Sequence, residues 1–190
     1  MIFKGDIVSF LEQNTKKYDI IYADPPWQFR DRTPQEVLSS KSQYAVMSIE
    51  NLQNLNIPKI SKDNCILYLW VPTSMIKEGL NLVEKWGFVY KTKLYWIKIG
   101  RLGTGYYYRN QVEECLVAIK GKIKPFHLTI RNYIEEKSKG HSIKPDGVLN
   151  IINTTAEKLG LNDKIELFAR NDRQNWDSVG LEIPIELIWG

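Results

Sequence analysis

The chain has 190 residues, of which 43% are hydrophobic and 25% are charged. This length predicts a single domain, and the globular balance of residue types excludes an intrinsically disordered chain. No apolar run approaches the roughly 18 residues of a transmembrane helix, and the N-terminus lacks the pattern of a secretory signal, so we expect a cytoplasmic protein. The cysteines Cys65 and Cys115 lie within apolar runs, which predicts buried thiols in a reducing compartment and no metal site.

The net charge of +4 is unevenly distributed along the chain. Residues 91–144 contain 12 Lys and Arg against 4 Glu, a local excess of +8, whereas the remainder has 14 basic and 18 acidic residues, a local excess of −4. A positive middle segment in an otherwise acidic chain suits a polyanion such as nucleic acid, which would dock on one face. A solvated, lysine-rich surface is the other interpretation.

The first half of the chain contains two apolar runs that we interpret as buried strands. Residues 19–23 form the first run, which ends at a proline pair, because proline cannot extend a central ladder. Residues 28–46 are polar and turn-rich and predict a mobile loop, followed by a short helix capped by Ser48. Residues 65–71 form the second strand, and the apolar spacing over 73–86 predicts a helix that ends at Gly87.

The second half of the chain alternates strands with one long helix. We expect strands at 88–98, 114–119 and 164–169, and a helix that begins at Lys144 or Pro145 and ends at Leu159. The alternation predicts an α/β fold with substantial parallel pairing. In such sheets the ligand lies beyond the carboxyl ends of the strands, so the segments 24–27, 71–73 and 170–176 are expected to meet at one mouth.

The tetrapeptide Asp24-Pro25-Pro26-Trp27 suits a planar substrate that bears an amino group. Asp24 supplies an acceptor, the prolines fix the direction of the Pro25 carbonyl, and Trp27 offers a broad π-face. The lone pair of an exocyclic base amine is delocalised into the ring, so two acceptors on the amine protons are needed to push it towards an electrophile. Positioning then carries the reaction without a covalent enzyme intermediate. The other interpretation is a strand end with a tight turn and a core tryptophan.

The tetrapeptide resembles the catalytic motif of the MT-A-type adenine-N6 methyltransferases, and the resemblance covers nearly the whole chain. The family includes the catalytic subunit of the eukaryotic mRNA adenosine writer and prokaryotic and phage DNA adenine methyltransferases. Membership implies a Rossmann-like class I methyltransferase fold, with a mostly parallel sheet flanked by helices. The other segments that resemble family motifs, in the family's order, are 5–7, 44–47, 56–58, 67–71, 103–105, 113–117, 141–145 and 166–170, followed by Asn175, Trp176 and Gly180.

The resemblance also implies roles for individual residues. The catalytic set would be Asp24, Pro25, Pro26 and Trp27, in which Asp24 and the Pro25 carbonyl accept hydrogen bonds from the adenine amine and Trp27 stacks on or walls the base. The cofactor would be S-adenosylmethionine, converted to S-adenosylhomocysteine, with no metal. The residues that would hold the cofactor are Asp6, Ile7, Asp24, Pro26, Lys144, Phe168, Arg170, Asn171 and Asp172.

Some of these assignments compete with purely structural readings. Lys144 beside a helix start is unfavourable for the helix dipole and suits an external anion, such as the cofactor carboxylate, but it also suits an ordinary surface lysine. Arg170 is expected either to contact the cofactor or to pair with Glu166 or Asp172. His141 reads equally as a surface histidine.

A nucleic-acid surface is predicted near residues 100–112 and 120–140. Its Tyr-rich, Arg-rich loop could stack on bases and contact phosphates, or it could pack within a β-hairpin. Tyr44 resembles a gate after the catalytic loop. The residues expected to contact substrate or nucleic acid are Tyr44, Arg101, Tyr106, Tyr108, Arg109, Lys120, Lys122 and Lys124.

The sequence departs from the family pattern at two places near its C-terminus. Only five residues separate Arg170 from Trp176, whereas the family's writer subunit has a longer stretch whose His-Asn pair contacts the cofactor ribose. The resemblance therefore does not decide between Asn171 and Asp172 for the ribose contact. The family's usual Gly-Asn pair is Gly180-Leu181 here, which either removes a polar contact or moves it to Glu182.

Our first hypothesis is an adenine-N6 methyltransferase of prokaryotic or phage type that acts on DNA, because the chain is small and shows no RNA-targeting additions. RNA remains an alternative substrate because the catalytic pocket contacts only the base. The alternatives are the same reaction on RNA adenosine, a cytosine-N4 methyltransferase that activates its exocyclic amine in the same way, and a catalytically silent nucleic-acid-binding subunit. Silent partners in this family usually lack the tetrapeptide, which this chain retains. We also expect a homodimer or a separate partner subunit. A duplex target must be flipped out or already single-stranded, since the amine is paired inside the stack.

Overall fold

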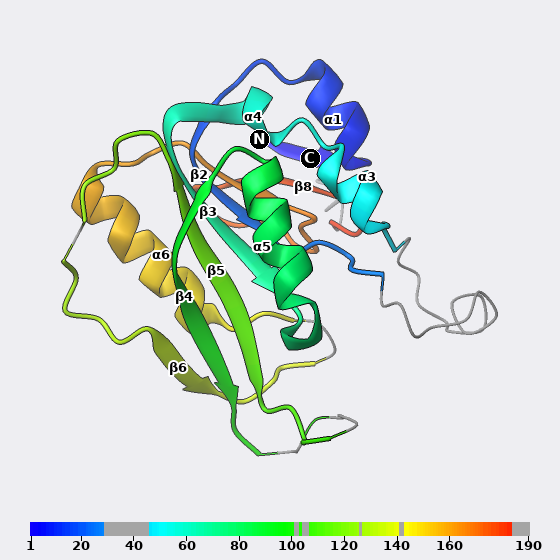
Figure 1. Cartoon of the computed structure of the whole chain (residues 1–190). Helices are drawn as coiled ribbons and strands as arrows, with labels where there is room; N and C mark the ends of the chain where they lie inside the picture. Colours follow the sequence, from blue (N-terminus) through cyan, green and yellow to red (C-terminus); the bar gives the residue numbers. More distant parts are fainter. Residues whose placement is uncertain (29–45, 101–102, 104–106, 126, 141–142, 184–190) are drawn as a thin grey trace, which may run out of the picture.

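The computed structural model describes residues 1–28, 46–100, 103, 107–125, 127–140 and 143–183. Its strands and helices alternate along most of the chain (Figure 1). The strands are β1 (Ile2–Lys4), β2 (Tyr18–Ala23), β3 (Ser61–Val71), β4 (Val89–Lys98), β5 (Val112–Lys120), β6 (Tyr133–Glu136), β7 (Lys164–Leu167) and β8 (Asp177–Gly180). The helices are α1 (Ile7–Gln13), α3 (Ile49–Gln53), α4 (Ile57–Ile60), the 3-10 turn η1 (Thr73–Met75), α5 (Ile76–Lys85) and α6 (Asp146–Leu159).

All eight strands described belong to one sheet, in the order β1-β8-β7-β2-β3-β5-β4-β6. The neighbouring pairs are parallel except for those that involve β5, which runs antiparallel to both β3 and β4. The carboxyl ends of the seven parallel strands therefore lie at the same edge of the sheet as the amino end of β5. We call this edge the mouth.

The sheet separates two apolar layers because successive side chains of a strand point to opposite faces. On β3, Leu67 and Leu69 pack in a core with α1, α3, α4 and α5, whereas Tyr68 and Trp70 pack in a second core with α6. Figure 1 shows α5 in front of the sheet, with α6 on the other side of β4 and β5. Both cores are continuous with the central strands, which are buried on both faces, as expected for a parallel sheet covered by helices.

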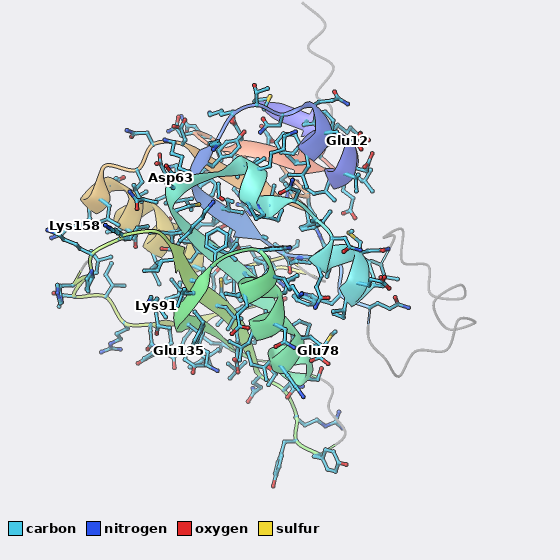
Figure 2. The ribbon with its side chains drawn as sticks, turned by 45° about the horizontal axis from the view of Figure 1, so that its top comes forward. Glu12, Asp63, Glu78, Lys91, Glu135 and Lys158 are labelled. Atoms are coloured by element: carbon cyan, nitrogen blue, oxygen red, sulfur yellow. The ribbon has the colours of Figure 1, made fainter. Side chains whose placement is uncertain are left out.

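Local sequence signals explain where the helices begin and end. The Asp6 and Ser48 side chains accept hydrogen bonds from the Ser9 and Asn51 backbone N–H groups and so cap α1 and α3. Gly160 ends α6 with a left-handed conformation, φ 67°, that glycine adopts without steric cost. Figure 2 shows the charged side chains Glu12, Glu78 and Lys158 at the outside of the molecule, on helices whose apolar faces cover the sheet.

Most of the predicted elements are present. The predicted strands at 19–23, 65–71, 88–98, 114–119 and 164–169 correspond to β2, β3, β4, β5 and β7, although β3 begins four residues earlier than expected. The helix predicted over 73–86 is divided into η1 and α5, and Pro145 is the N-cap of α6 rather than a residue of its first turn. The sequence reading made no prediction for β1, α1, α4, β6 or β8. The loop expected at 28–46 lies almost wholly outside the described residues.

The α/β architecture that the sequence predicted is confirmed. Both cysteines are buried and free, as expected. In the part of the chain that is described, no helix is long and apolar enough to cross a membrane.

Candidate active site

Asp24 lies at the centre of the mouth because it directly follows β2, which is flanked by the parallel strands β7 and β3. Its side chain is 18% exposed, and its Oδ1 atom lies 3.1 Å from the Lys144 ammonium group. Burial raises the pKa of Asp24, and Lys144 and Arg170 lower it by stabilising the ionised form, with a net pKa above the ordinary value. The mouth therefore contains a carboxylate whose charge depends on a neighbouring lysine.

Lys144 bridges two carboxylates. Its ammonium group lies 3.0 Å from Glu113 Oε2 as well as 3.1 Å from Asp24, and it sits 5.1 Å from the centre of the Trp70 ring. Burial lowers the pKa of Lys144, and the charges of Asp24 and Glu113 more than reverse that effect. The cofactor carboxylate that the sequence assigned to Lys144 would have to share this ammonium group with both side chains.

The rest of the tetrapeptide forms a compact turn. The Trp27 N–H donates to the Pro25 carbonyl over 2.9 Å, and the Pro26 carbonyl accepts from the Met47 N–H over 2.9 Å. The Pro25 oxygen keeps its second lone pair, so it can still accept a hydrogen bond from a substrate amine. Trp27 is only 7% exposed, and its indole N–H donates to the Trp70 carbonyl over 3.0 Å. Its ring is mainly part of the core and anchors the turn.

A second part of the mouth is formed by the carboxyl ends of β1, β8 and β7. Asp6 follows β1, and its carboxylate accepts from the Ser9 N–H and hydroxyl over 2.9 and 2.6 Å, which lowers its pKa. Ile7 is buried beneath it. Phe168 follows β7 in a left-handed conformation, φ 61°, which non-glycine residues rarely adopt and which is enriched at functional sites. These residues follow β1 and β7, which are separated in the sheet by β8 alone, and the cofactor contacts expected of them remain a prediction.

The ion pairs at the end of β7 differ from the two that the sequence suggested for Arg170, one with Glu166 and the other with Asp172. Glu166 pairs with Arg173, not with Arg170, and burial raises the pKa of Glu166 while Arg173 lowers it. The Arg170 Nε atom lies 3.9 Å from Glu182. The alternative in which Arg170 pairs with Glu166 is therefore wrong. Asn171 and Asp172 are exposed beside the mouth, and the structure gives them no contact that selects one of them for a ribose.

The predicted nucleic-acid loop lies partly outside the described residues, which include neither Tyr44, Arg101 nor Tyr106. Tyr108 is 88% exposed, Tyr107 is 95% exposed, and Arg109 is exposed beside them. This segment precedes β5 and so lies at the mouth edge of the sheet. Its described aromatic side chains do not pack in a hairpin core.

The three predicted lysines at the end of β5 are not brought together with Asp24. Because β5 is antiparallel, Lys120 lies at the opposite edge of the sheet from Glu114, about 20 Å away at the usual rise per strand residue. The Lys120 ammonium group donates to the Ser61 hydroxyl over 2.7 Å, whereas Lys122 and Lys124 are exposed.

The sequence reading missed one charged residue of the site, Glu113. Its motif was noticed, but no role was assigned, because its approach to Lys144 depends on β5 running antiparallel. The available signal was an acidic residue at the start of an apolar strand. This signal indicates a position at the mouth only if the strand is known to run antiparallel to its neighbours, as β5 does. Within the described residues, no group of three or more His, Cys, Asp or Glu side chains is placed to hold a metal ion.

The comparisons with known proteins decide the family. The sequence profile of the MT-A70 family matches residues 18–182, which include the tetrapeptide, Lys144 and the residues after β7. This chain belongs to the MT-A70 family. MT-A70 membership, with the α/β sheet, makes it a methyltransferase and confirms the family and fold that the sequence predicted.

The relatives within and near the MT-A70 family differ in size. The chain is 36% identical over 188 residues to the Type II methyltransferase M.MunI of Mycoplasma sp, covering 89% of this chain and 79% of that protein. It is 28% identical over 177 residues to human N(6)-adenosine-methyltransferase catalytic subunit METTL3, covering 88% of this chain and 28% of METTL3. A putative N(6)-adenosine-methyltransferase MT-A70-like protein of Medicago truncatula is 27% identical, with 94% and 28% covered. The chain thus spans little more than a quarter of these eukaryotic relatives.

Proposed function

We propose that this protein transfers a methyl group from S-adenosylmethionine to the N6 amine of adenine in DNA. The observation that carries the proposal is the environment of Asp24, an acceptor held 3.1 Å from Lys144 at the centre of the mouth and followed by the rigid Pro25-Pro26 turn. Similarity to N(6)-adenosine-methyltransferases supports adenine, and similarity over 79% of the Type II methyltransferase M.MunI supports DNA.

The residues at the mouth fit the proposed cofactor. S-adenosylmethionine is a planar base on a ribose, joined to a sulfonium, an ammonium and a carboxylate group. Asp24 suits a positive group, Lys144 and Arg170 suit the carboxylate, and the partly buried Phe168 suits an apolar face. Asp6 at the end of β1 keeps acceptor capacity beyond its bonds to Ser9, as a base or ribose contact requires. We therefore assign this half of the mouth, from β1 to β2, to the cofactor.

The chain's own groups activate the amine by position. S-adenosylmethionine, when bound, supplies the electrophilic methyl group. The two N–H groups of the adenine amine donate hydrogen bonds, one to Asp24 and one to the Pro25 carbonyl. These bonds favour a pyramidal nitrogen, whose lone pair then points out of the plane of the base. Lys144 favours the ionised form of Asp24 against the effect of burial, and the excess proton of the methylated amine passes to Asp24 or to solvent. Trp27 keeps the turn in place through the Trp70 carbonyl and walls the base with its exposed edge.

The nucleic acid is proposed to approach over the segment that precedes β5. Tyr107 and Tyr108 are highly exposed aromatic side chains at this edge, and Arg109 adds a cation beside them. Aromatic faces stack on unpaired bases and arginine contacts phosphate, so these groups suit a strand whose target base is extrahelical. We also propose that the 190 residues act as one catalytic domain inside the cell, with a second copy or a partner subunit able to contribute to target recognition.

The experiment that tests the proposal is transfer of a tritiated methyl group from S-adenosylmethionine to duplex DNA, single-stranded DNA and RNA of matched sequence. Digestion to nucleosides then identifies the product. We expect label in N6-methyldeoxyadenosine from DNA. Label in RNA alone would move the substrate to RNA, and label in N4-methylcytosine would contradict the adenine assignment. Absence of label from a folded protein that binds S-adenosylmethionine would indicate a silent or incomplete subunit.

A further inference from the structure

Four side chains of alternating charge form a continuous line at the mouth. Asp24 contacts Lys144 over 3.1 Å, Lys144 contacts Glu113 over 3.0 Å, and Glu113 forms an ion pair with Lys98. Each comes from a different part of the chain: the end of β2, the residue pair before α6, the start of β5 and the end of β4. The line thus links the carboxylate assigned to the substrate amine to the strand pair that carries the exposed tyrosines.

The strands hold Glu113 firmly in this line. Glu113 is paired across the sheet with Trp96, and the neighbouring Lys98 N–H donates to the Gln111 carbonyl over 2.7 Å. The Lys98 ammonium group lies 4.8 Å from the centre of the Trp96 ring, so two favourable contacts, the ring and Glu113, fix it. The side chains of Glu113 and Lys98 are each 29% exposed. Because they are largely buried, water screens their mutual attraction less than it would at the surface.

Glu113 competes with Asp24 for a single ammonium group. Burial raises the pKa of Glu113, and Lys144 and Lys98 outweigh that effect, so the pKa of Glu113 lies below its ordinary value and the side chain is ionised. A lysine that serves two carboxylates can donate fewer hydrogen bonds to each. Four other charged or titratable groups face Asp24. Arg170 is a cation and favours the ionised form of Asp24. The other three supply no positive charge that could take the place of Lys144; they are Glu166, Tyr22 and Cys115.

We propose that Glu113, fixed by Lys98, is a positioning residue that holds Lys144 between two carboxylates and so prevents Lys144 from fully occupying Asp24. Asp24 then retains lone pairs for the adenine amine. The catalytic part of this inference rests on the proposed function, whereas the coupling between Glu113 and Asp24 does not.

The substitution that tests the inference is Glu113→Gln, which keeps the shape and removes the charge. Lys144 then belongs to Asp24 alone, and Asp24 loses a neighbouring negative charge. Both changes favour the ionised form of Asp24, so its pKa should fall by about one unit. The carboxyl carbon of Asp24 can be titrated by NMR in protein labelled with ¹³C-aspartate, with its signal assigned by comparison with Asp24→Asn.

The chain provides a matched control at the next residue. Glu114 pairs with Lys93 over 2.7 Å and points to the opposite face of the sheet, towards the α5 layer. Glu114→Gln removes the same charge from the same strand, so it should leave the titration of Asp24 unchanged. Glu113→Asp retains the charge and should bring the titration back towards that of the wild-type protein.

The catalytic consequence is measured separately. With saturating DNA and S-adenosylmethionine, Glu113→Gln should lower the plateau value of kcat by up to about tenfold, because Asp24 becomes a weaker acceptor by about one pKa unit. The acid limb of the kcat profile should move to lower pH. A structural defect would lower kcat without moving the acid limb of its pH profile. An unchanged titration of Asp24 in Glu113→Gln would overturn the inference. A shifted titration in a protein whose wild type transfers no methyl group would instead count against the proposed function alone.

Discussion

Asp24 is governed by two opposing influences, burial at the end of β2 and the charge of Lys144. Burial favours the protonated carboxyl group, whereas an ammonium group 3.1 Å away favours the carboxylate. The carboxylate accepts hydrogen bonds from the lysine and from an amine proton more strongly than the protonated carboxyl group does. The activity of the residue therefore depends on its neighbours as much as on its identity.

Lys144→Met tests this balance at the residue scale. Because the ionised form of Asp24 accepts the amine, the rate falls as the pH decreases through the pKa of Asp24. Removal of the cation leaves burial opposed only by Arg170, so that pKa rises, and the acid limb of the kcat profile should move to higher pH by about one to two units. The profile is measured with both substrates saturating and with the fold checked by circular dichroism. A limb that stays in place or moves to lower pH contradicts this account.

The sequence identified most single residues of the site but not their contacts. Asp24 and Lys144 were each assigned a role, yet their ion pair was not foreseen, because 120 positions separate them and no local pattern reports the approach. Glu113 was missed for the same reason. Arg173 was not singled out, although it is the partner of Glu166. Ion pairs depend on strand direction and order, which single-sequence patterns do not determine.

At the scale of elements, the strand β8 closes the cofactor half of the mouth through a contact that requires glycine. A Cβ atom at Gly180 would lie 1.8 Å from the Ala169 carbonyl oxygen, while the Ala169 N–H donates to the Val179 carbonyl over 2.7 Å. The close approach places the segment after β7 against β8.

Gly180→Ala should therefore destabilise the protein by about 3 kcal/mol, the upper end of the usual cost of forcing extra volume into a packed site, because the added Cβ atom meets backbone atoms. Gly160→Ala is the comparison, because Gly160 is surrounded by open space and carries only the cost of its positive φ, about 1 kcal/mol. Urea unfolding of both variants measures the difference. Equal stabilities would show that the backbone near Ala169 relaxes without cost.

The predictable elements are those with long apolar runs. The strands β2 and β3 and the helix α6 were evident because apolar spacing and flanking Pro or Gly residues agree. The strands β1, β6 and β8 have three or four residues and derive their pairing from neighbours rather than from their own composition. No helix is predicted from the sequence at α1, although its N-cap, Asp6, lies in a segment that resembles a family motif. The sequence therefore predicted the class of fold but not the order of the sheet.

At the scale of the whole molecule, the mouth brings together around β2 the half that we propose for the cofactor and the half that we propose for the substrate. Part of the positive charge in residues 91–144 is paired, because Lys93, Lys98 and Lys144 each form ion pairs with glutamates. The exposed remainder includes Arg109 near the mouth and Lys122 and Lys124 at the opposite edge. The charge excess alone thus overstates the surface available to a polyanion.

The combined substitution Lys122→Glu/Lys124→Glu tests whether nucleic acid extends to that far edge. If both lysines contact phosphates, the slope of log K against log salt should decrease by about 2. Lys77→Glu/Lys85→Glu, on exposed positions of α5, has the same change in charge and should leave the slope unaltered. Fluorescence anisotropy with labelled DNA measures the slopes. An unaltered slope for the first pair would confine the interface to the mouth.

The central claim is that Asp24 activates an adenine amine for methyl transfer. It is tested most directly by measuring N6-methyldeoxyadenosine formed in a single turnover on duplex DNA by the wild-type protein and by Asp24→Asn, which keeps the shape but loses the charge. We predict N6-methyldeoxyadenosine from the wild type and a rate at least about 100-fold lower for Asp24→Asn, with the fold retained. A rate for Asp24→Asn equal to that of the wild type would contradict the claim.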